Sequence, residues 1–411
     1  MNRTRLVIAP GKEKALQRHH PWIFSGAVKC TEGNPQEGDL VDVVDTHGQW
    51  LASGHYQQES IICKVLSFDT PQIDEAFFRR RLQSAIDYRC RLGFFTSAST
   101  NVFRLIHAEG DFLPGLVADW YNGVLVLQAH SVGMHRLFPM LTDLCVDLLK
   151  PLGLRSIFDK SGATLPGGGA TDGYLWGETP DEWEITEHGN RLLINFFEGQ
   201  KTGFFVDQRE NRALVQQFAA GHRVLNCFGY TGGFSLAALR GGADFVETVD
   251  ISRKAVELCN RNVALNFGPD APHRGTVADV LDFLAHPASS VPQQPMGVHV
   301  PSAEVAAPYD FIILDPPAFA KSHRHLQQGL KGYRAINQKA METLPQGGML
   351  MTFSCSQAVS RDDFQIMVFT AAMTARRRVR IVRRLPHAAD HPVSICHPEG
   401  EYLKGLLLQV E

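Results

Sequence analysis

The feature that most constrains this chain is the alternation of apolar strands with helical segments that starts at about residue 191. The stretch HRVLNCFGYTGGFSLAALRGGADFVETVD predicts a strand over 224–227, a glycine-containing turn, a helix from about 234 and a second strand that ends at Asp250. In YDFIILDPPAFAKS a further strand ends at Asp315, because the two prolines that follow lack N–H groups and fix φ. This alternation predicts a doubly wound parallel sheet, in which ligands bind at the carboxyl ends of the strands.

The turn after the first of these strands reads G-Y-T-G-G, which differs from the G-x-G-x-x-G of a dinucleotide site. It therefore favours a nucleoside-type cofactor over one held by its pyrophosphate. An acid at the end of the second strand, Asp250, is placed to bind ribose hydroxyls. The alternative is an ordinary strand-to-helix turn followed by an exposed acid.

Composition limits the class of protein. At 411 residues the chain exceeds what one hydrophobic core usually organises, so two or three domains are expected. A formal charge of −3 counts mildly against a polyanion binder, unless local patches hold the partner. No run approaches the roughly twenty apolar residues of a membrane span. The eight cysteines are widely spaced without C-x-x-C, and there is no H-E-x-x-H, which predicts reduced thiols, a cytoplasmic location and no metal site.

Two basic segments are candidate RNA contacts. Residues 1–70 alternate apolar and polar residues in short runs, which predicts a small β-rich module. Its first 30 residues carry six Lys or Arg against the single acid Glu13, beside Trp22 and Phe24, a combination that suits phosphates and unstacked bases. Near the end of the chain stand six arginines with no acid among them, at 376, 377, 378, 380, 383 and 384. For both segments the alternative is a solvated charged face.

The middle region, 71–190, predicts an α+β domain without assignable chemistry. A helix is expected over 72–95, a hairpin turn at Asn122-Gly123, and a second helix with Leu137, Leu141, Leu144 and Leu148 on one face. The remaining residues, 191–411, form the predicted strand-helix domain. A run with five prolines within 286–308 predicts a disordered surface insertion.

Cys355 stands alone where the apolar run 348–353 ends and polar residues begin, as at the carboxyl end of a buried strand. Without further context a cysteine in this position is more often a small buried hydrophobe than a nucleophile.

The residues from Asn226 to Gly233 resemble motif I of class I S-adenosylmethionine-dependent methyltransferases, Asp250 resembles their ribose-binding acid, and Asp315-Pro316-Pro317 resembles their motif IV. Over nearly the whole chain the sequence is similar to the bacterial 23S ribosomal RNA large-subunit methyltransferase I family, which methylates cytosine at carbon 5. The motifs that carry this resemblance are GKEKALQRHHPWIFSGAV, GQKTGFFVDQRENR, LNCFGYTGGFS, DPPAFAKS, LMTFSCS and HPEGEYLKG. Residues 161–184 match the family less clearly.

The resemblance implies a fold and partners. An RNA-binding PUA domain is expected at 1–70, a central α+β domain at 71–190 and a Rossmann-like catalytic domain at 191–411. RVRIVRRL and YLKGLLLQVE lack a helix between them, and by resemblance they include the antiparallel strand that closes methyltransferase sheets. The cofactor implied is S-adenosylmethionine and the partner is 23S ribosomal RNA, without a membrane or a metal. The oligomeric state and the modified cytosine stay open.

The resemblance also implies the cofactor-binding residues. Asp250 would take the ribose hydroxyls and Asp279 the adenine amino group, while Asp207 and Arg209 would close over the cofactor. An alternative for Asp207 is a helix N-cap, since Glu210 completes a capping-box spacing. The residues expected to line the methionine and adenosine are Asn226, Phe228, Tyr230, Thr231 and Gly232, and Asp315 and Pro316 of motif IV complete the set.

The implied chemistry changes the interpretation of Cys355. Carbon 5 of cytosine is a weak nucleophile, so a thiolate first adds to carbon 6, and Cys355 is the expected thiolate. Asp315 would hydrogen-bond the cytosine N3 and amine edge. Many RNA cytosine-C5 methyltransferases carry a second cysteine directly after Asp-Pro-Pro, where this chain has Ala318. The base that removes the carbon 5 proton is therefore not identified.

Two rival functions remain. A methyltransferase of an exocyclic base nitrogen needs no thiol and uses Asp/Asn-Pro-Pro-aromatic, but Phe319 stands one place late for that pattern. The other rival is a non-catalytic RNA-binding protein that retains the cofactor fold.

Overall fold

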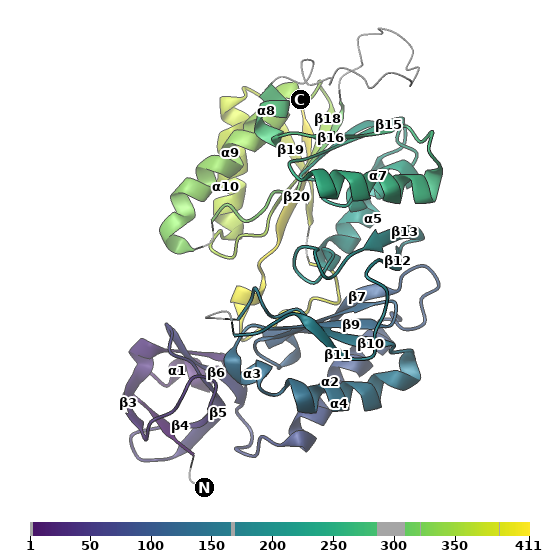
Figure 1. Cartoon of the computed structure of the whole chain (residues 1–411). Coiled ribbons are helices and arrows are strands. Elements are labelled where there is room, and N and C mark those ends of the chain that lie inside the picture. The colour runs from purple at the N-terminus through teal and green to yellow at the C-terminus, as the bar shows by residue number, and fades with distance from the viewer. Residues whose placement is uncertain (1–2, 166–168, 286–308, 321, 386) are drawn as a thin grey trace. The chain divides into compact units, whose positions relative to one another are not determined.

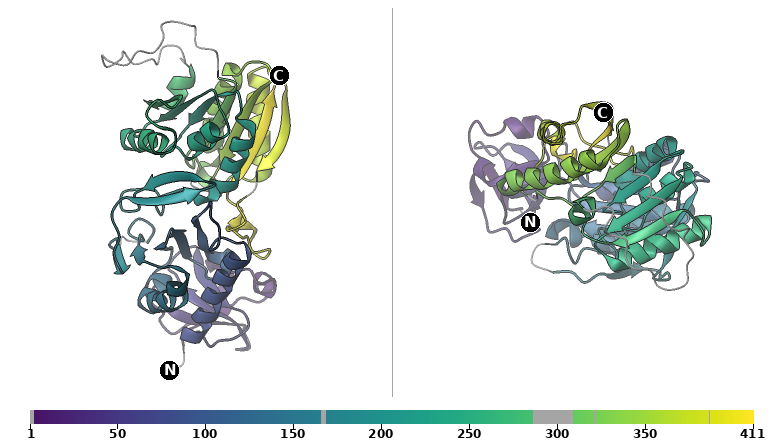
Figure 2. Two further views of the ribbon diagram at one scale, coloured as in Figure 1. Left: turned by 90° about the vertical axis from the view of Figure 1, so that its right-hand side faces the viewer. Right: turned by 90° about the horizontal axis from the view of Figure 1, so that it is seen from above.

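The structure is a computed structural model that describes residues 3–165, 169–285, 309–320, 322–385 and 387–411 (Figures 1 and 2). It contains two compact units. The first comprises the described residues up to Glu187 with Ile194–Asp207 and Ala388–Gly400, and the second comprises His188–Leu193, Gln208–His387 and Glu401–Glu411. The three-domain division at residues 70 and 190 stays a prediction. The proline-rich insertion expected at 286–308 lies outside the described residues.

The first unit begins with a six-stranded sheet, in the order β2-β6-β5-β4-β1-β3. Alternate side chains of these strands face a small core that includes Leu6, Ile8, Val41 and Val43. The β-rich prediction for this segment is confirmed. The elements are β1 (Arg5–Ile8), α1 (Lys14–Gln17), β2 (Trp22–Phe24), β3 (Val28–Glu32), β4 (Leu40–Val44), β5 (Trp50–Tyr56) and β6 (Ile61–Ser67).

A five-stranded sheet follows, in the order β11-β10-β9-β8-β7. The predicted hairpin is confirmed, because β8 and β9 pair antiparallel around Asn122 and Gly123, whose φ values are 49° and 94°. Two positive φ angles are what a two-residue hairpin turn with the strands' own twist requires. The elements are α2 (Glu75–Arg91), β7 (Val102–His107), β8 (Leu116–Tyr121), β9 (Val124–Ala129), α3 (Val132–His135), α4 (Phe138–Leu149), β10 (Ser156–Asp159) and β11 (Gly173–Trp176).

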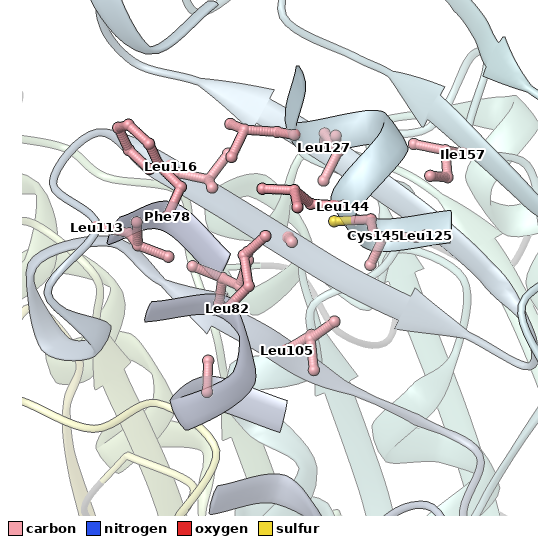
Figure 3. Close-up of a cluster of buried hydrophobic side chains, with 14 of the residues drawn as sticks. Phe78, Leu82, Leu105, Leu113, Leu116, Leu125, Leu127, Leu144, Cys145 and Ile157 are labelled. Atoms are coloured by element: carbon pink, nitrogen blue, oxygen red, sulfur yellow. The ribbon is translucent and has the colours of Figure 1, made fainter. Parts of the chain in front are cut away.

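Helices α2 and α4 bury one stripe each against this sheet (Figure 3). Phe78 and Leu82 of α2 lie four residues apart and so share a face, as Leu141 and Cys145 do on α4. Figure 3 shows these helices' side chains beside Leu105 and other residues of the strands. Burial raises the pKa of the Cys145 thiol to about 12, as expected for a cysteine that only packs.

A buried ion pair ties α2 to the chain beyond β7. The Arg89 guanidinium donates to both carboxylate oxygens of Asp111, at 2.5 and 2.8 Å, and its Nε donates to the carbonyl of Arg104 at 2.8 Å. Arg89 is fully buried. A buried guanidinium is tolerated when its donors are satisfied in this way.

The second unit is built on a seven-stranded sheet in the order β16-β15-β14-β17-β18-β20-β19. Strands β14 to β18 run parallel, and β20 pairs antiparallel with both β18 and β19, so the expected closing antiparallel strand is present. Figure 1 shows α8, α9 and α10 on one side of the sheet and α5 and α7 on the other.

The parallel strands and their helices are β14 (Arg223–Cys227), α6 (Gly233–Arg240), β15 (Phe245–Asp250), α7 (Arg253–Phe267), β16 (His273–Val277), α8 (Val280–Ala285), β17 (Phe311–Leu314), α9 (Leu326–Thr343) and β18 (Gly348–Ser354). They are preceded by α5 (Arg209–Phe218) and followed by α10 (Arg361–Thr374), β19 (Val379–Leu385) and β20 (Lys404–Val410). A further, two-stranded sheet is formed by β12 (Trp183–Glu187) and β13 (Asn190–Ile194).

Two details correct the sequence interpretation. Asp207 is not the N-cap of the helix that follows, because α5 has Gln208 at that position and no side-chain cap hydrogen bond. Asp207 instead lies in a short 3₁₀ turn and accepts a hydrogen bond from Lys201 at 3.1 Å.

In the arginine cluster, Arg377 has a structural role. Its guanidinium donates to four carbonyl oxygens, those of Met341, Leu344, Pro345 and Glu411.

Candidate active site

The strand order places the candidate residues at one edge of the seven-stranded sheet. β14 lies between β15 and β17, so the chain leaves the middle of the sheet in both directions, which is the switch point where doubly wound sheets bind ligands. Asp250 ends β15, Asp315 follows β17 and Cys355 follows β18. All three residues therefore lie at the carboxyl edge of the parallel strands, as the sequence pattern predicted.

The turn after β14 has an unusual backbone. Phe228 and Tyr230 have φ values of 58° and 45°, in the left-handed region that non-glycine residues rarely adopt, and Gly232 has a φ of 86°. Such strain persists only where the surroundings fix it, and it is common at ligand sites. The turn is anchored to β15, since the Gly229 N–H donates to the Val249 carbonyl at 3.1 Å.

Glycine is required in this turn by close packing. A Cβ at Gly229 would lie 2.2 Å from the Thr248 methyl carbon, and one at Gly232 would lie 2.4 Å from the Cys259 sulfur. The backbone therefore rests directly on β15 and α7, and this contact holds the turn beside Asp250.

Asp250 orders the turn and keeps acceptor capacity for a ligand. Its carboxylate accepts from the Tyr230 N–H at 3.0 Å through one oxygen and from the Ser252 N–H at 2.8 Å through the other. Each carboxylate oxygen has a second lone pair, and Asp250 is partly exposed. A ribose with two neighbouring hydroxyls fits such an acceptor.

Two buried polar atoms of the same segment lack protein partners. The Asn226 amide donates to the Ser235 hydroxyl at 2.8 Å. Its Oδ1 and the Thr231 hydroxyl are buried and have no hydrogen-bond partner within the part of the chain that the structure describes. Buried polar atoms are normally paired, so these atoms fit the polar amino-acid group of a ligand such as S-adenosylmethionine.

Gln208 orients Asp315, a role that the sequence interpretation missed. Its amide donates to Asp315 Oδ1 at 2.9 Å and accepts from the Asn211 amide at 2.6 Å. Gln208 and Asn211 are both buried, so the carboxylate of Asp315 is held by a fixed donor. The available signal was the motif GFFVDQRENR, in which Gln208 stands between the predicted cofactor residues Asp207 and Arg209.

Cys355 lies against the Asp-Pro-Pro turn. Because β17 and β18 pair in register, with Leu314 opposite Thr352, the two strand ends meet, and the Cys355 sulfur is 3.8 Å from the Pro316 carbonyl oxygen. Cys355 is half-buried. Cys227 and Cys259 of the same unit are fully buried, and burial raises the pKa of both thiols, that of Cys259 to about 12. Among these three, Cys355 is the thiol suited to chemistry.

A polar network lies behind Cys355. The Ser356 hydroxyl bonds the Tyr333 hydroxyl at 2.7 Å and accepts from the Ala320 N–H at 3.2 Å. Burial raises the pKa of Tyr333. The Lys404 ammonium donates to the Ser356 and Tyr402 carbonyls at 2.6 Å each. Sequence reasoning singled out neither Tyr333 nor Lys404, although Lys404 lies in the motif HPEGEYLKG.

The other predicted residues are placed less directly. Asp279, after β16, is exposed and caps α8 by accepting from the Leu281 and Asp282 N–H groups at 2.8 and 3.1 Å. Arg209 is buried in α5 with its Nε 3.2 Å from Glu210. Asp207 belongs to the first unit. Contacts of these three with a cofactor stay predictions.

The residues that the structure describes contain no group of three or more His, Cys, Asp or Glu side chains arranged to hold a metal ion. In the same residues, none of the helices has the length and apolar character needed to cross a membrane.

Comparisons with known proteins agree with this geometry. Residues 167–407 match the S-adenosylmethionine-dependent methyltransferase family, and residues 6–68 match a PUA-like domain. The chain is 38% identical over 409 residues to Ribosomal RNA large subunit methyltransferase I of Escherichia coli strain SMS-3-5, and this match covers 99% of each of the two chains. It is also 38% identical to the protein of that name from Pseudoalteromonas translucida, with 98% of this chain and 99% of the relative covered.

Solved structures show the same fold at lower identity. A Streptococcus mutans protein described as a SAM-dependent methyltransferase has a TM-score of 0.83 at 20% identity, and a methyltransferase solved as a complex with SAH has a TM-score of 0.84 at 21% identity. Each comparison covers 100% of both chains. A PUA-like amino-terminal domain, a Rossmann-like sheet and a full-length match at 38% identity lead to one conclusion. This chain belongs to the S-adenosylmethionine-dependent methyltransferases, in the family whose members are named Ribosomal RNA large subunit methyltransferase I.

Proposed function

We propose that this protein methylates carbon 5 of a cytosine in 23S ribosomal RNA. The observation that carries the proposal is the half-buried Cys355 thiol, 3.8 Å from the Pro316 carbonyl at the cofactor edge of the sheet. The names of the full-length relatives support a large-subunit ribosomal RNA as the substrate, and the PUA-like domain supports an RNA partner. A cytoplasmic location goes with such a substrate.

The residues of the turn would hold the cofactor. Asp250 would accept from the ribose hydroxyls, and the unpaired polar atoms of Asn226 and Thr231 would meet the amino-acid group. We also expect Phe228, Tyr230 and Gly232 to line this site through their left-handed backbone. When bound, S-adenosylmethionine supplies the sulfonium methyl group that carbon 5 takes up.

Cys355 and Asp315 would make carbon 5 reactive. The Cys355 thiolate forms a C–S bond to carbon 6, the π electrons of the 5,6 double bond shift to form a double bond between carbons 4 and 5, and the π electrons of the carbon 4–N3 bond take up a proton at N3, which leaves an enamine that is nucleophilic at carbon 5. Asp315, held by Gln208, hydrogen-bonds the N3 and amine edge and favours this protonation. After methylation the carbon 5 proton leaves, the 5,6 double bond re-forms as the C–S bond breaks, and N3 gives up its proton, so the thiolate is released and the enzyme returns to its starting state.

A Cys355→Ala variant tests the proposal. It should abolish methyl transfer and leave cofactor and RNA binding intact, because a missing nucleophile removes a bonding step and no ground-state contact. With RNA that carries 5-fluorocytidine at the target, wild-type protein should form a denaturant-stable adduct, since fluorine cannot leave as a proton does. Cys396→Ala is the matched control, because Cys396 is also half-buried but lies in the other unit.

Three results would contradict this proposal. Carbon 5 methylation by Cys355→Ala at near wild-type rate would return Cys355 to a packing role and reject the adduct mechanism, while carbon 5 would remain the target. An N-methyl product would favour the exocyclic-nitrogen reaction, and cofactor binding without transfer to any RNA would favour a non-catalytic RNA-binding protein. Mass spectrometry of the methylated nucleoside separates these outcomes.

The division of labour between domains is also a proposal. We assign RNA binding to residues 1–70, a central supporting role to 71–190 and catalysis to 191–411. Asp207, Arg209 and Asp279 remain candidate cofactor contacts in this proposal, as do Asp315 and Pro316.

A further inference from the structure

Lys404 is a buried cation. The side chain lies at the start of β20 and the residue is 4% exposed. Its ammonium donates to the carbonyl oxygens of Ser356 and Tyr402, at 2.6 Å each, and neither acceptor carries a charge. Burying a charge costs free energy unless a charge or several dipoles offset it. Two carbonyls fix the position of this ammonium but do not neutralise it.

Lys404 flanks Cys355 along the sheet. In the antiparallel pairing of β18 with β20, Lys404 stands opposite Ser354, the residue before Cys355. Its bond to the Ser356 carbonyl reaches the residue after Cys355. The ammonium is therefore held beside the backbone that carries the thiol.

Three other groups that the structure describes on the neighbouring elements differ from Lys404 in charge or in exposure. Asp315, beyond β17, carries a carboxylate, which disfavours a nearby thiolate. The Tyr333 hydroxyl on α9 is neutral, because burial raises its pKa. Arg361 of α10 and Glu401 form an ion pair with each other on the exposed surface. A cation held close to Cys355 stabilises its thiolate, and Lys404 is a buried cation in such a position.

We propose that Lys404 is a positioning residue that stabilises the thiolate form of Cys355. The inference rests on the proposed function in taking Cys355 as the nucleophile. The thiol proton passes to solvent, Lys404 keeps its three protons, and the resulting ion pair holds the sulfur in its nucleophilic state. Burial lowers the pKa of Lys404 to about 8, while the charge of Cys355 raises it, which agrees with an electrostatic interaction between the two groups.

The test measures the charge state of the sulfur without RNA or methylation. Alkylation by iodoacetamide is followed from pH 5.5 to 10 on the peptide that contains Cys355, by mass spectrometry, with the Cys396 peptide of the same sample as reference. Lys404→Gln keeps a hydrogen-bond donor and loses the charge, whereas Lys404→Arg keeps both. Lys404→Gln should raise the midpoint of Cys355 alkylation by about one pH unit, so that alkylation at pH 7 becomes about tenfold slower. Lys404→Arg should stay near wild type.

Each outcome decides the proposal. An unchanged midpoint in Lys404→Gln overturns it, and an equal shift in Lys404→Gln and Lys404→Arg assigns Lys404 a packing role only. Cofactor affinity, measured in parallel, reports whether each variant is folded. If neither variant folds, wild-type protein still gives an answer, because the Cys355 midpoint should lie below that of Cys396, and the reverse order refutes the ion pair. A confirmed shift together with an N-methyl product would reject the proposed function and keep the Lys404–Cys355 interaction.

Discussion

At the scale of single residues, Asp250 combines a structural and a binding role. Its carboxylate accepts two backbone N–H groups, from Tyr230 and Ser252, and so it fixes the strained turn after β14. We expect Asp250→Ala to weaken S-adenosylmethionine binding by about 1.5 to 3 kcal/mol, because charge-assisted hydrogen bonds to the ribose disappear and the turn loses its anchor. Isothermal titration calorimetry measures this change.

Asp244→Ala is the matched control for that experiment. Asp244 is an exposed acid directly before the other end of the same strand, so its removal should leave the affinity within experimental error. Unchanged affinity in a folded Asp250→Ala variant would refute the assignment of the ribose site.

At the scale of elements, the ion pair between Arg89 and Asp111 joins α2 to the segment after β7. Arg89 is fully buried and the Asp111 side chain is 6% exposed. We expect Asp111→Asn to lower the free energy of unfolding by about 3 to 5 kcal/mol, because it leaves a buried guanidinium without its charge partner. Urea unfolding followed by circular dichroism measures the decrease.

The same helix provides the comparison. Arg79 of α2 pairs with Asp147 of α4 at 2.5 Å, but the Asp147 side chain is 61% exposed. Asp147→Asn should therefore change the free energy of unfolding by at most about 1 kcal/mol. Equal effects of the two substitutions would show that burial does not set the strength of these pairs.

At the scale of the whole molecule, the net charge of −3 means that RNA must be held by local basic surface. Lys12 and Lys14 are exposed, whereas Arg3 pairs with Asp42 at 3.2 Å and Arg5 with Glu32 at 3.8 Å. Replacing all four residues with Gln should flatten the salt dependence of RNA binding by roughly 0.7 to 0.9 for each phosphate that is no longer neutralised. Most of the change should come from Lys12 and Lys14, for which the described residues provide no such ion pair.

Fluorescence anisotropy across a salt series gives the slope. Lys339→Gln on α9 serves as control, since this partly exposed lysine pairs with Glu342 at 2.9 Å and lies outside the basic segment. A slope that the fourfold replacement does not move would place the RNA on another surface.

The sequence alone determined the features that depend on a few neighbouring residues. The strand ends at Asp250, Asp315 and Cys355 follow from apolar runs that stop at turn residues, and the hairpin at Asn122-Gly123 follows from the φ values that its turn type demands. Parallel strands bring their carboxyl ends to one edge, so local pattern also predicted that the candidate residues would meet there.

The tertiary structure decided which side chains meet across long separations in the chain. Gln208 reaches Asp315 over 107 positions, and Lys404 reaches the Ser356 carbonyl over 48. Neither interaction can be predicted from neighbouring residues in the sequence, because each depends on the order of the strands and on the face of the sheet toward which a side chain points. The sequence has a capping-box spacing at Asp207. In the structure, however, a 3₁₀ turn over Val206–Gln208 precedes the helix, which begins at Arg209, and the Asp207 carboxylate accepts from Lys201. The spacing of residues in the sequence indicates a possible hydrogen bond, and the tertiary structure determines which of the available partners forms it.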